Sequence, residues 1–145
     1  MGLKDRLSAR RRPTATYSLR IDDDTVARAE LGAARAAGDE ARIVAAQEAV
    51  EACYEQVTIT ALSPVDLEAL IAAHPPPKEL QGQKVFNPAT FIPALLAVSV
   101  DSDVTEDDWA EYYTSGAMTT GEVAHLFEAV WSLNHRPPDP SLPKE

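Results

Sequence analysis

Four helix-start signals in the second half of the chain limit what it can fold into. Each begins with a residue whose side chain can cap free backbone N–H groups, followed by proline at the first helical position or by a carboxylate three residues later. The signals are Ser63 with Pro64, Asn87 with Pro88, Thr105 with Asp108, and Thr119 with Glu122. Apolar residues at helical spacing follow them. This half is therefore predicted to be a group of short helices.

The helix that starts at Asn87 is predicted to be the central buried element of this group. Its apolar residues lie nearly all round the helix, which is typical of a helix without a solvent face. They are Phe91, Ile92, Leu95, Leu96 and Val98. Pro93 falls within the first two turns, where a missing backbone donor costs less than in mid-helix. A polar, proline-led linker at 75–86 precedes this helix.

The first half of the chain predicts a helical hairpin bracketed by two strands. Residues 14–21 and 57–62 are rich in β-branched, aromatic and apolar residues, as strands are. Between them, helices are expected at about 25–37 and 40–56, separated by Gly38-Asp39 as a stop and restart. A two-stranded ribbon is marginal in water by itself, so it must pack on something or pair with strands of another chain.

The expected fold class is mainly α, with about five to six helices and a small two-stranded β element around the hairpin. The predicted organisation is a basic flexible arm at 1–13, a strand–hairpin–strand lobe at 14–62, a helical domain at 63–135 and a disordered proline-rich tail at 136–145. The length of 145 residues suits one domain with an appended lobe.

Charge is unevenly distributed along the chain. The formal net charge is -10, from 13 Lys and Arg against 23 Asp and Glu, which argues against nucleic acid as a partner. Five basic residues nevertheless lie in the first twelve positions: Lys4, Arg6, Arg10, Arg11 and Arg12. This arm could dock on the acidic face of a neighbouring copy, or it could be a solvated terminus. Self-association through the arm or through strand edges is expected.

Compartment and membrane association follow from two further features. Cys53 is the only cysteine, so an internal disulfide is excluded and a reducing cytoplasm is expected. The longest apolar runs fall well short of the ~18 residues that a membrane span needs. The sequence therefore predicts no membrane segment.

The sequence contains no complete motif for metal binding, phosphate binding or catalysis. His74, His125 and His135 are not spaced for a zinc site, and Cys53 lacks a second cysteine. The series Asp101, Asp103, Thr105 and Asp107 resembles the start of a calcium loop, but Glu106 stands where glycine is needed and Tyr112 where a glutamate is needed. The sequence contains no glycine-rich phosphate loop and no nucleophile elbow. We predict no catalytic residues, no metal and no cofactor, and therefore a protein that is not an enzyme.

Aromatic residues of the C-terminal half are the candidates for binding another protein. Trp and Tyr dominate binding hot spots, although aromatic residues at helical spacing are also common in cores. The predicted partner-binding residues are Phe91, Trp109, Tyr112, Tyr113, Phe127 and Trp131, some of which must belong to the core.

Three segments of residues 63–134 resemble the tail assembly chaperones of long-tailed phages and prophages of actinobacteria. The segments are LEALIAAHPPPKE, FNPATFIPALLAVSV and TEDDWAEYYTSGAMTTGEVAHLFEAVWSLN. A looser resemblance extends over the strand and hairpin region at 14–62, so it covers most of the chain. The motifs are moderately specific, and none is catalytic.

The resemblance implies a role in building a virion. Proteins of this family bind the long helical tape measure protein, keep it soluble and help tail tube protein subunits polymerise around it. It implies action in the cytoplasm of the bacterial host and absence from the mature virion. In many phages a ribosomal frameshift adds a C-terminal extension, and the proline-rich tail would suit such a junction. The alternative is a structural component of a phage tail or phage-like particle, which would use the strands at 14–21 and 57–62 to extend sheets between copies.

Overall fold

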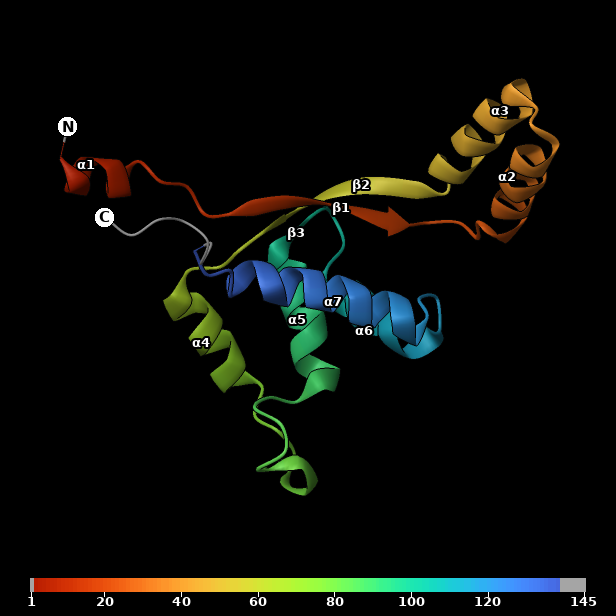
Figure 1. The fold of residues 1–145 in the computed structure, drawn as a ribbon. Helices are drawn as coiled ribbons and strands as arrows, with labels where there is room; N and C mark the ends of the chain where they lie inside the picture. The colour runs from red at the N-terminus through yellow and green to blue at the C-terminus, as the bar shows by residue number, and fades with distance from the viewer. Residues whose placement is uncertain (1, 139–145) are drawn as a thin grey trace. The chain divides into compact units, whose positions relative to one another are not determined.

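The computed structural model describes residues 2–138, and these are predominantly helical (Figure 1). The elements in chain order are α1 (Leu3–Ser8), β1 (Thr14–Arg20), α2 (Thr25–Ala37), α3 (Glu40–Glu51), β2 (Tyr54–Thr60), α4 (Pro64–Ala73), a 3-10 turn (Lys78–Leu80), α5 (Pro88–Ser99), β3 (Val100–Asp101), α6 (Glu106–Ser115) and α7 (Thr120–Asn134). The prediction of a mainly helical chain is confirmed. Among these elements, no helix has the length and hydropathy of a membrane span.

The prediction of a two-stranded β element is wrong, because the sheet has three strands in the order β1-β2-β3. The third strand, β3, is two residues long and follows α5 directly. It pairs antiparallel with β2, where Thr58 lies opposite Asp101 and Ile59 opposite Val100. A two-residue strand is too short to show an alternating pattern in the sequence, and pairing with β2 defines it.

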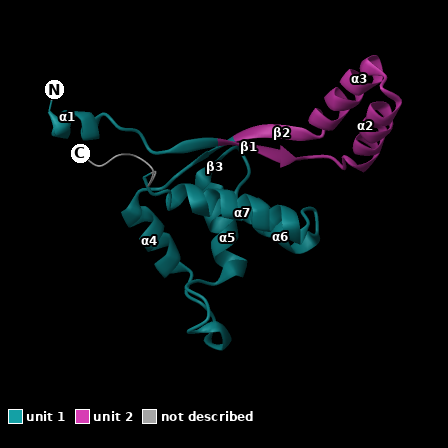
Figure 2. Ribbon diagram, viewed as in Figure 1, with its two compact units in different colours: residues 1–15, 58–145 teal, residues 16–57 magenta. Residues whose placement is uncertain are grey.

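The chain divides into two compact units (Figure 2). Unit 1 comprises residues 1–15 and 58–145, and unit 2 comprises residues 16–57. The lobe predicted at 14–62 corresponds to unit 2 with a few more residues at each end. Most of the tail predicted at 136–145 lies outside the described residues.

Unit 2 contains a helical hairpin with a thin core. Helix α2 is capped by Gly38, whose φ of 66° lies in the left-handed region, and the Asp39 side chain then accepts the Arg42 N–H at 3.2 Å to start α3. The hairpin buries Leu31, Ala34 and Ala46. The small side chains of Ala34 and Ala46 let the two helices approach closely.

The second helix of the hairpin is shorter than predicted. It was expected to reach residue 56, but α3 ends at Glu51 and β2 starts at Tyr54. The Cys53 carbonyl accepts the backbone N–H of Ile21 at 2.8 Å and of Asp22 at 3.2 Å. Pairing with the end of β1 therefore takes these residues out of the helix, despite their helical spacing.

Unit 1 is built around α5, as predicted. Six residues of this helix are buried: Phe91, Pro93, Ala94, Leu95, Leu96 and Ser99. Helix α7 contributes its own buried stripe, which is Val123, Leu126, Val130 and Leu133. Smaller contributions come from α4, α6 and the strands, through Leu67, Trp109, Ile59, Ala61 and Val100.

All four predicted helix-start signals are confirmed as caps. The Ser63 hydroxyl accepts the Asp66 N–H at 3.1 Å, and the Asn87 side chain accepts the Ala89 N–H at 3.2 Å. Complete capping boxes begin α6 and α7, at Thr105 and Thr119. Each box satisfies two backbone donors that would otherwise lack an intrahelical partner.

Candidate protein-binding site

Aromatic side chains from three parts of unit 1 form one cluster at its surface. Phe86, Phe127 and Trp131 are half-buried and surround the buried Phe91; we call these four residues the aromatic face. Phe86 stacks on Phe91 with 4.1 Å between ring centroids, and Phe127 stacks on Trp131 at 5.7 Å. Phe86 also lies 5.6 Å from Trp131. Half-exposed rings held in this way are preorganised to contact another apolar surface.

Local backbone contacts hold the linker residue Phe86 against the helices. The next residue, Asn87, donates its N–H to the His74 carbonyl at 2.8 Å, which ties the end of the linker to the end of α4. The His74 ring meets Phe91 edge-on at 6.3 Å. The linker was predicted to be polar, and Phe86 was not among the predicted site residues. A lone aromatic residue directly before a helix cap was the signal that could have indicated it.

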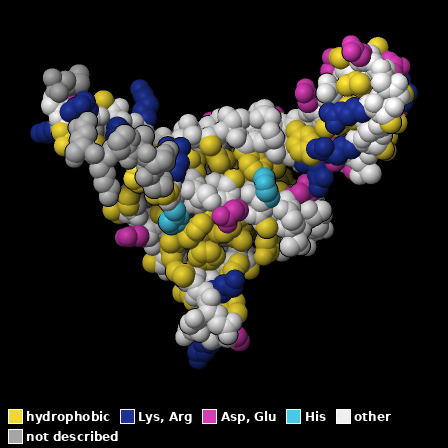
Figure 3. Space-filling view, in the orientation of Figure 1, with side chains coloured by type: hydrophobic (Ala, Val, Ile, Leu, Met, Phe, Trp, Pro, Cys, Tyr) yellow, Lys and Arg dark blue, Asp and Glu magenta, His cyan; other side chains and the backbone are white. Residues whose placement is uncertain are grey.

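The space-filling view shows that unit 1 also presents apolar surface to solvent. In Figure 3, hydrophobic side chains gather into one patch beside helix α7, over the region of α4 and α5. A contiguous apolar patch on a small protein marks an interaction surface more often than scattered apolar residues do.

A second apolar feature, the α6–α7 groove, lies in the same unit. It has a volume of about 450 Å³ and is lined by Ile92, Tyr113, Met118, Val123 and Ala124, with threonine and glycine at its rim. An adjoining narrow crevice shares Ile92, Tyr113, Met118 and Val123 with the groove and is also lined by Trp109, which is only 4% exposed. The Trp109 indole N–H has no hydrogen-bond acceptor among the described residues.

Helix α7 connects the groove to the aromatic face. Ala124 lines the groove, while Phe127 and Trp131 belong to the aromatic face. These three residues are three and four positions apart, so they lie along one side of the helix. A partner helix with apolar residues at the same spacing could contact both features at once.

The predicted site residues divide between core and surface. Phe91 and Trp109 are in the core, with exposures of 0% and 4%. Tyr112 is half-buried and meets Trp109 edge-on at 6.0 Å, and Tyr113 is 38% exposed beside the groove. Phe127 and Trp131 lie together in the aromatic face. The structure thus brings two of the six together at the surface, and it adds residues that the sequence did not indicate: Phe86, Ile92 and Met118.

The segment that carries most of these features is acidic, and Lys84 and Arg136 flank it directly. Between residues 85 and 135 there is no Lys or Arg, although eight carboxylates are present. These are Asp101, Asp103, Glu106, Asp107, Asp108, Glu111, Glu122 and Glu128. Glu106 lies on the same side of α6 as Trp109 and Tyr113, three and seven positions away. A basic apolar partner therefore complements this part of unit 1 in charge.

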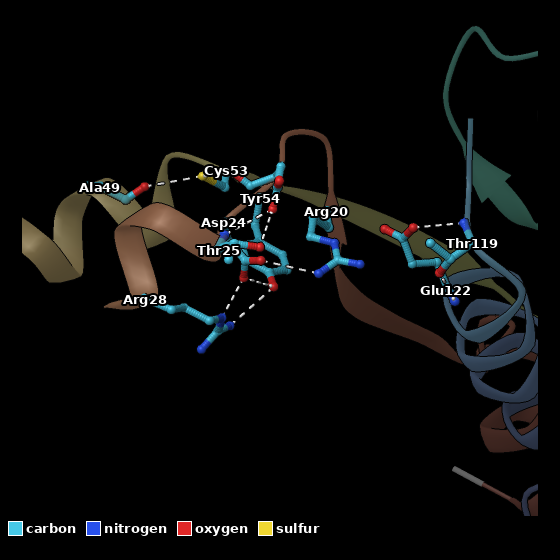
Figure 4. Close-up of polar contacts among 10 residues, drawn as sticks. Arg20, Asp24, Thr25, Arg28, Ala49, Cys53, Tyr54, Thr119 and Glu122 are labelled. Atoms are coloured by element: carbon cyan, nitrogen blue, oxygen red, sulfur yellow. Dashed lines mark hydrogen bonds and ion pairs between the residues drawn. The ribbon is translucent and has the colours of Figure 1, made fainter. Parts of the chain in front are cut away.

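Unit 2 has a polar cluster of its own, centred on Asp24 (Figure 4). The Asp24 carboxylate accepts hydrogen bonds from the Tyr54 hydroxyl at 2.6 Å, from Arg28 Nε and from Arg20 Nη1 at 3.2 Å. These donors, with the Tyr54 hydroxyl first, hold the pKa of Asp24 well below its usual range. The cluster ties the end of β1 and the start of α2 to the start of β2. Arg28 also donates to the Tyr54 hydroxyl at 3.1 Å, so the cluster is hydrogen-bonded internally.

Possible metal ligands do not converge within residues 2–138. No group of three or more His, Cys, Asp or Glu side chains is placed to hold a metal ion in this range. Cys53 is a free thiol that follows α3, and its Sγ lies 3.4 Å from the carbonyl oxygen of Ala49 in that helix.

The described residues form a predominantly helical protein that has half-exposed aromatic side chains clustered on unit 1. Comparisons with protein-family models, curated proteins and solved structures found no match for this chain.

Proposed function

We propose that this protein is a phage tail assembly chaperone, which binds the tape measure protein and promotes assembly of the tail tube. The observation that carries the proposal is the aromatic face, with its three half-exposed rings. The resemblance of residues 63–134 to tail assembly chaperones supplies the identity of the partner. We place its action in the cytoplasm of the bacterial host.

The physical task of such a chaperone fits an apolar surface on a helical unit. A long helical protein awaiting assembly exposes apolar faces that would otherwise aggregate. Binding an amphipathic helix requires anchoring side chains at helical spacing, which Ala124, Phe127 and Trp131 provide. Aromatic anchors in such interfaces can each contribute about 2 kcal/mol or more to binding.

Co-expression of the full chain with its tape measure protein tests the proposal. The wild type is expected to raise the soluble fraction of the tape measure protein, and the variant with Phe127→Ala and Trp131→Ala is expected to lose most of that effect. The matched control is the variant with Val26→Ala and Val65→Ala, two apolar side chains that are 82% and 74% exposed elsewhere. A tape measure protein that is equally insoluble with and without the chain would refute the proposal.

The sheet supports a second candidate, a structural component of a phage tail or phage-like particle. Strand β1 is an edge strand, since the order is β1-β2-β3, and edge strands can pair with strands of another chain. Mass spectrometry of purified particles separates the two functions. Stoichiometric presence of the chain would favour the structural role, and its absence would favour the chaperone.

A further inference from the structure

Helix α1 is an amphipathic helix that buries nothing. None of its six residues is buried, and Leu3 and Leu7 are 65% and 52% exposed. These leucines are four residues apart and share one side of the helix, with Lys4 and Arg6 flanking them. A helix this short is not stable in water on its own propensity, because nucleation costs more than so few hydrogen bonds return. It therefore needs a surface on which its leucines can pack.

We propose that α1 of one copy docks its leucines in the α6–α7 groove of a second copy of this chain. The groove is apolar, open and about 450 Å³ in volume, so it can accept side chains from a neighbouring helix. The occupant comes from another copy because both leucines are exposed on the chain that carries them. This inference goes beyond the proposed function and does not depend on it.

Charge complementarity favours this occupant. The first twelve residues carry five basic side chains and one acidic side chain. The segment that contains the groove, residues 85–135, carries eight acidic side chains and no Lys or Arg. The groove lining itself is uncharged, and Glu106, an exposed residue at the start of α6, is the carboxylate that we expect Lys4 or Arg6 of the docked helix to approach. Such charges guide the encounter and orient the helix, while the leucines supply the apolar contact.

The first test measures the mass of the full chain in solution by light scattering after size-exclusion chromatography. The wild type is expected at a multiple of the 15.7 kDa chain mass, and the variant with Leu3→Ser and Leu7→Ser at the mass of one chain. Val65→Ser, which alters a more exposed apolar residue in α4, should leave the wild-type mass unchanged. A wild type at the mass of one chain, or an unchanged mass in the leucine variant, would overturn the proposal.

The second test identifies the groove as the docking surface. In a Cys53→Ala background, one preparation carries Leu7→Cys and another carries Ala124→Cys. Mixing them under mild oxidation should give a disulfide-linked pair that contains both variants, whereas Leu7→Cys mixed with Val65→Cys should not. Absence of the Leu7–Ala124 product, or equal yield with the Val65 control, would place the contact elsewhere and contradict the proposal.

Discussion

Asp24 joins three backbone segments of unit 2 through its two carboxylate oxygens. Asp24 is only 3% exposed, and its carboxylate accepts hydrogen bonds from one tyrosine and two arginines. A buried carboxylate is tolerated only when it is paired and hydrogen-bonded in this way. The same donors explain why the residue titrates differently in the folded chain and in the unfolded chain.

We expect stability to fall at acid pH partly because of this residue. The pKa of Asp24 is lowered in the folded state, so the unfolded chain binds its proton more readily. The stabilisation is complete above the unfolded aspartate pKa of about 3.9 and is lost as the pH falls from there toward the lower folded pKa. Urea unfolding at a series of pH values should show this loss in the wild type and a smaller one in Asp24→Asn. Parallel pH profiles for the two proteins would contradict the expectation.

Phe91 and Trp131 belong to one aromatic cluster but should respond differently to truncation. Phe91 is fully buried, so Phe91→Ala is expected to lower the free energy of unfolding by about 3–5 kcal/mol, through lost burial and a cavity. Trp131 is half-buried, so Trp131→Ala should cost less stability while removing an anchor for a partner. Urea unfolding of both variants measures the difference, and equal losses would show that Trp131 is also a core residue.

At the scale of elements, helix α2 and the residue that caps it include two glycines in opposite conformational situations. Gly38 ends the helix with a φ of 66°, where a side chain is strained, whereas Gly32 lies within the helix and faces open space. Glycine in a helix interior is unfavourable relative to alanine, because its unfolded state has more conformational freedom.

Alanine at these two positions should therefore have opposite effects. Gly38→Ala is expected to destabilise the protein by about 1 kcal/mol, because alanine is disfavoured in the left-handed region. Gly32→Ala is expected to stabilise it by about 0.5–1 kcal/mol. Thermal unfolding followed by circular dichroism measures whether each variant has a lower or a higher unfolding temperature than the wild type. A shift in the same direction for both variants would mean that the end of α2 is not as described.

At the scale of the whole molecule, the two units have cores of very different size. Unit 2 buries three apolar residues among those described, namely Leu31, Ala34 and Ala46. Unit 1 buries a leucine-rich set on α5 and α7 together with Phe91 and Trp109. Regions with fewer buried apolar contacts open at lower free energy.

Native-state hydrogen exchange should therefore distinguish the units. Backbone amides of α2 and α3 are expected to exchange faster than those in the middle of α5 and α7, because less apolar surface must be exposed to open them. Mass spectrometry of peptic fragments resolves these segments. Equal protection of the four helices would indicate that the chain opens only as a whole.

The starts of four helices and the central place of α5 could be predicted from the amino-acid sequence. These features depend on residues close together in the chain. Four capping residues accept hydrogen bonds from backbone N–H groups two or three positions later: Ser63, Asn87, Thr105 and Thr119. Helix α5 carries apolar residues on nearly all sides, so it must be buried in any fold of this chain. Such short-range patterns can be predicted from a single sequence.

The third strand, the end of α3 and the choice of which aromatic side chains lie at the surface depend on long-range contacts. Val100 and Asp101 form a strand because β2 lies beside them, and Cys53 leaves the helix because its carbonyl accepts N–H groups from Ile21 and Asp22. Likewise, Phe91 and Phe127 look alike in the sequence, yet one is sealed in the core and the other is half-exposed. Strand pairing and side-chain packing between distant segments determine these features. Helical spacing places aromatic residues on one side of a helix, but it does not show which of them are exposed to solvent.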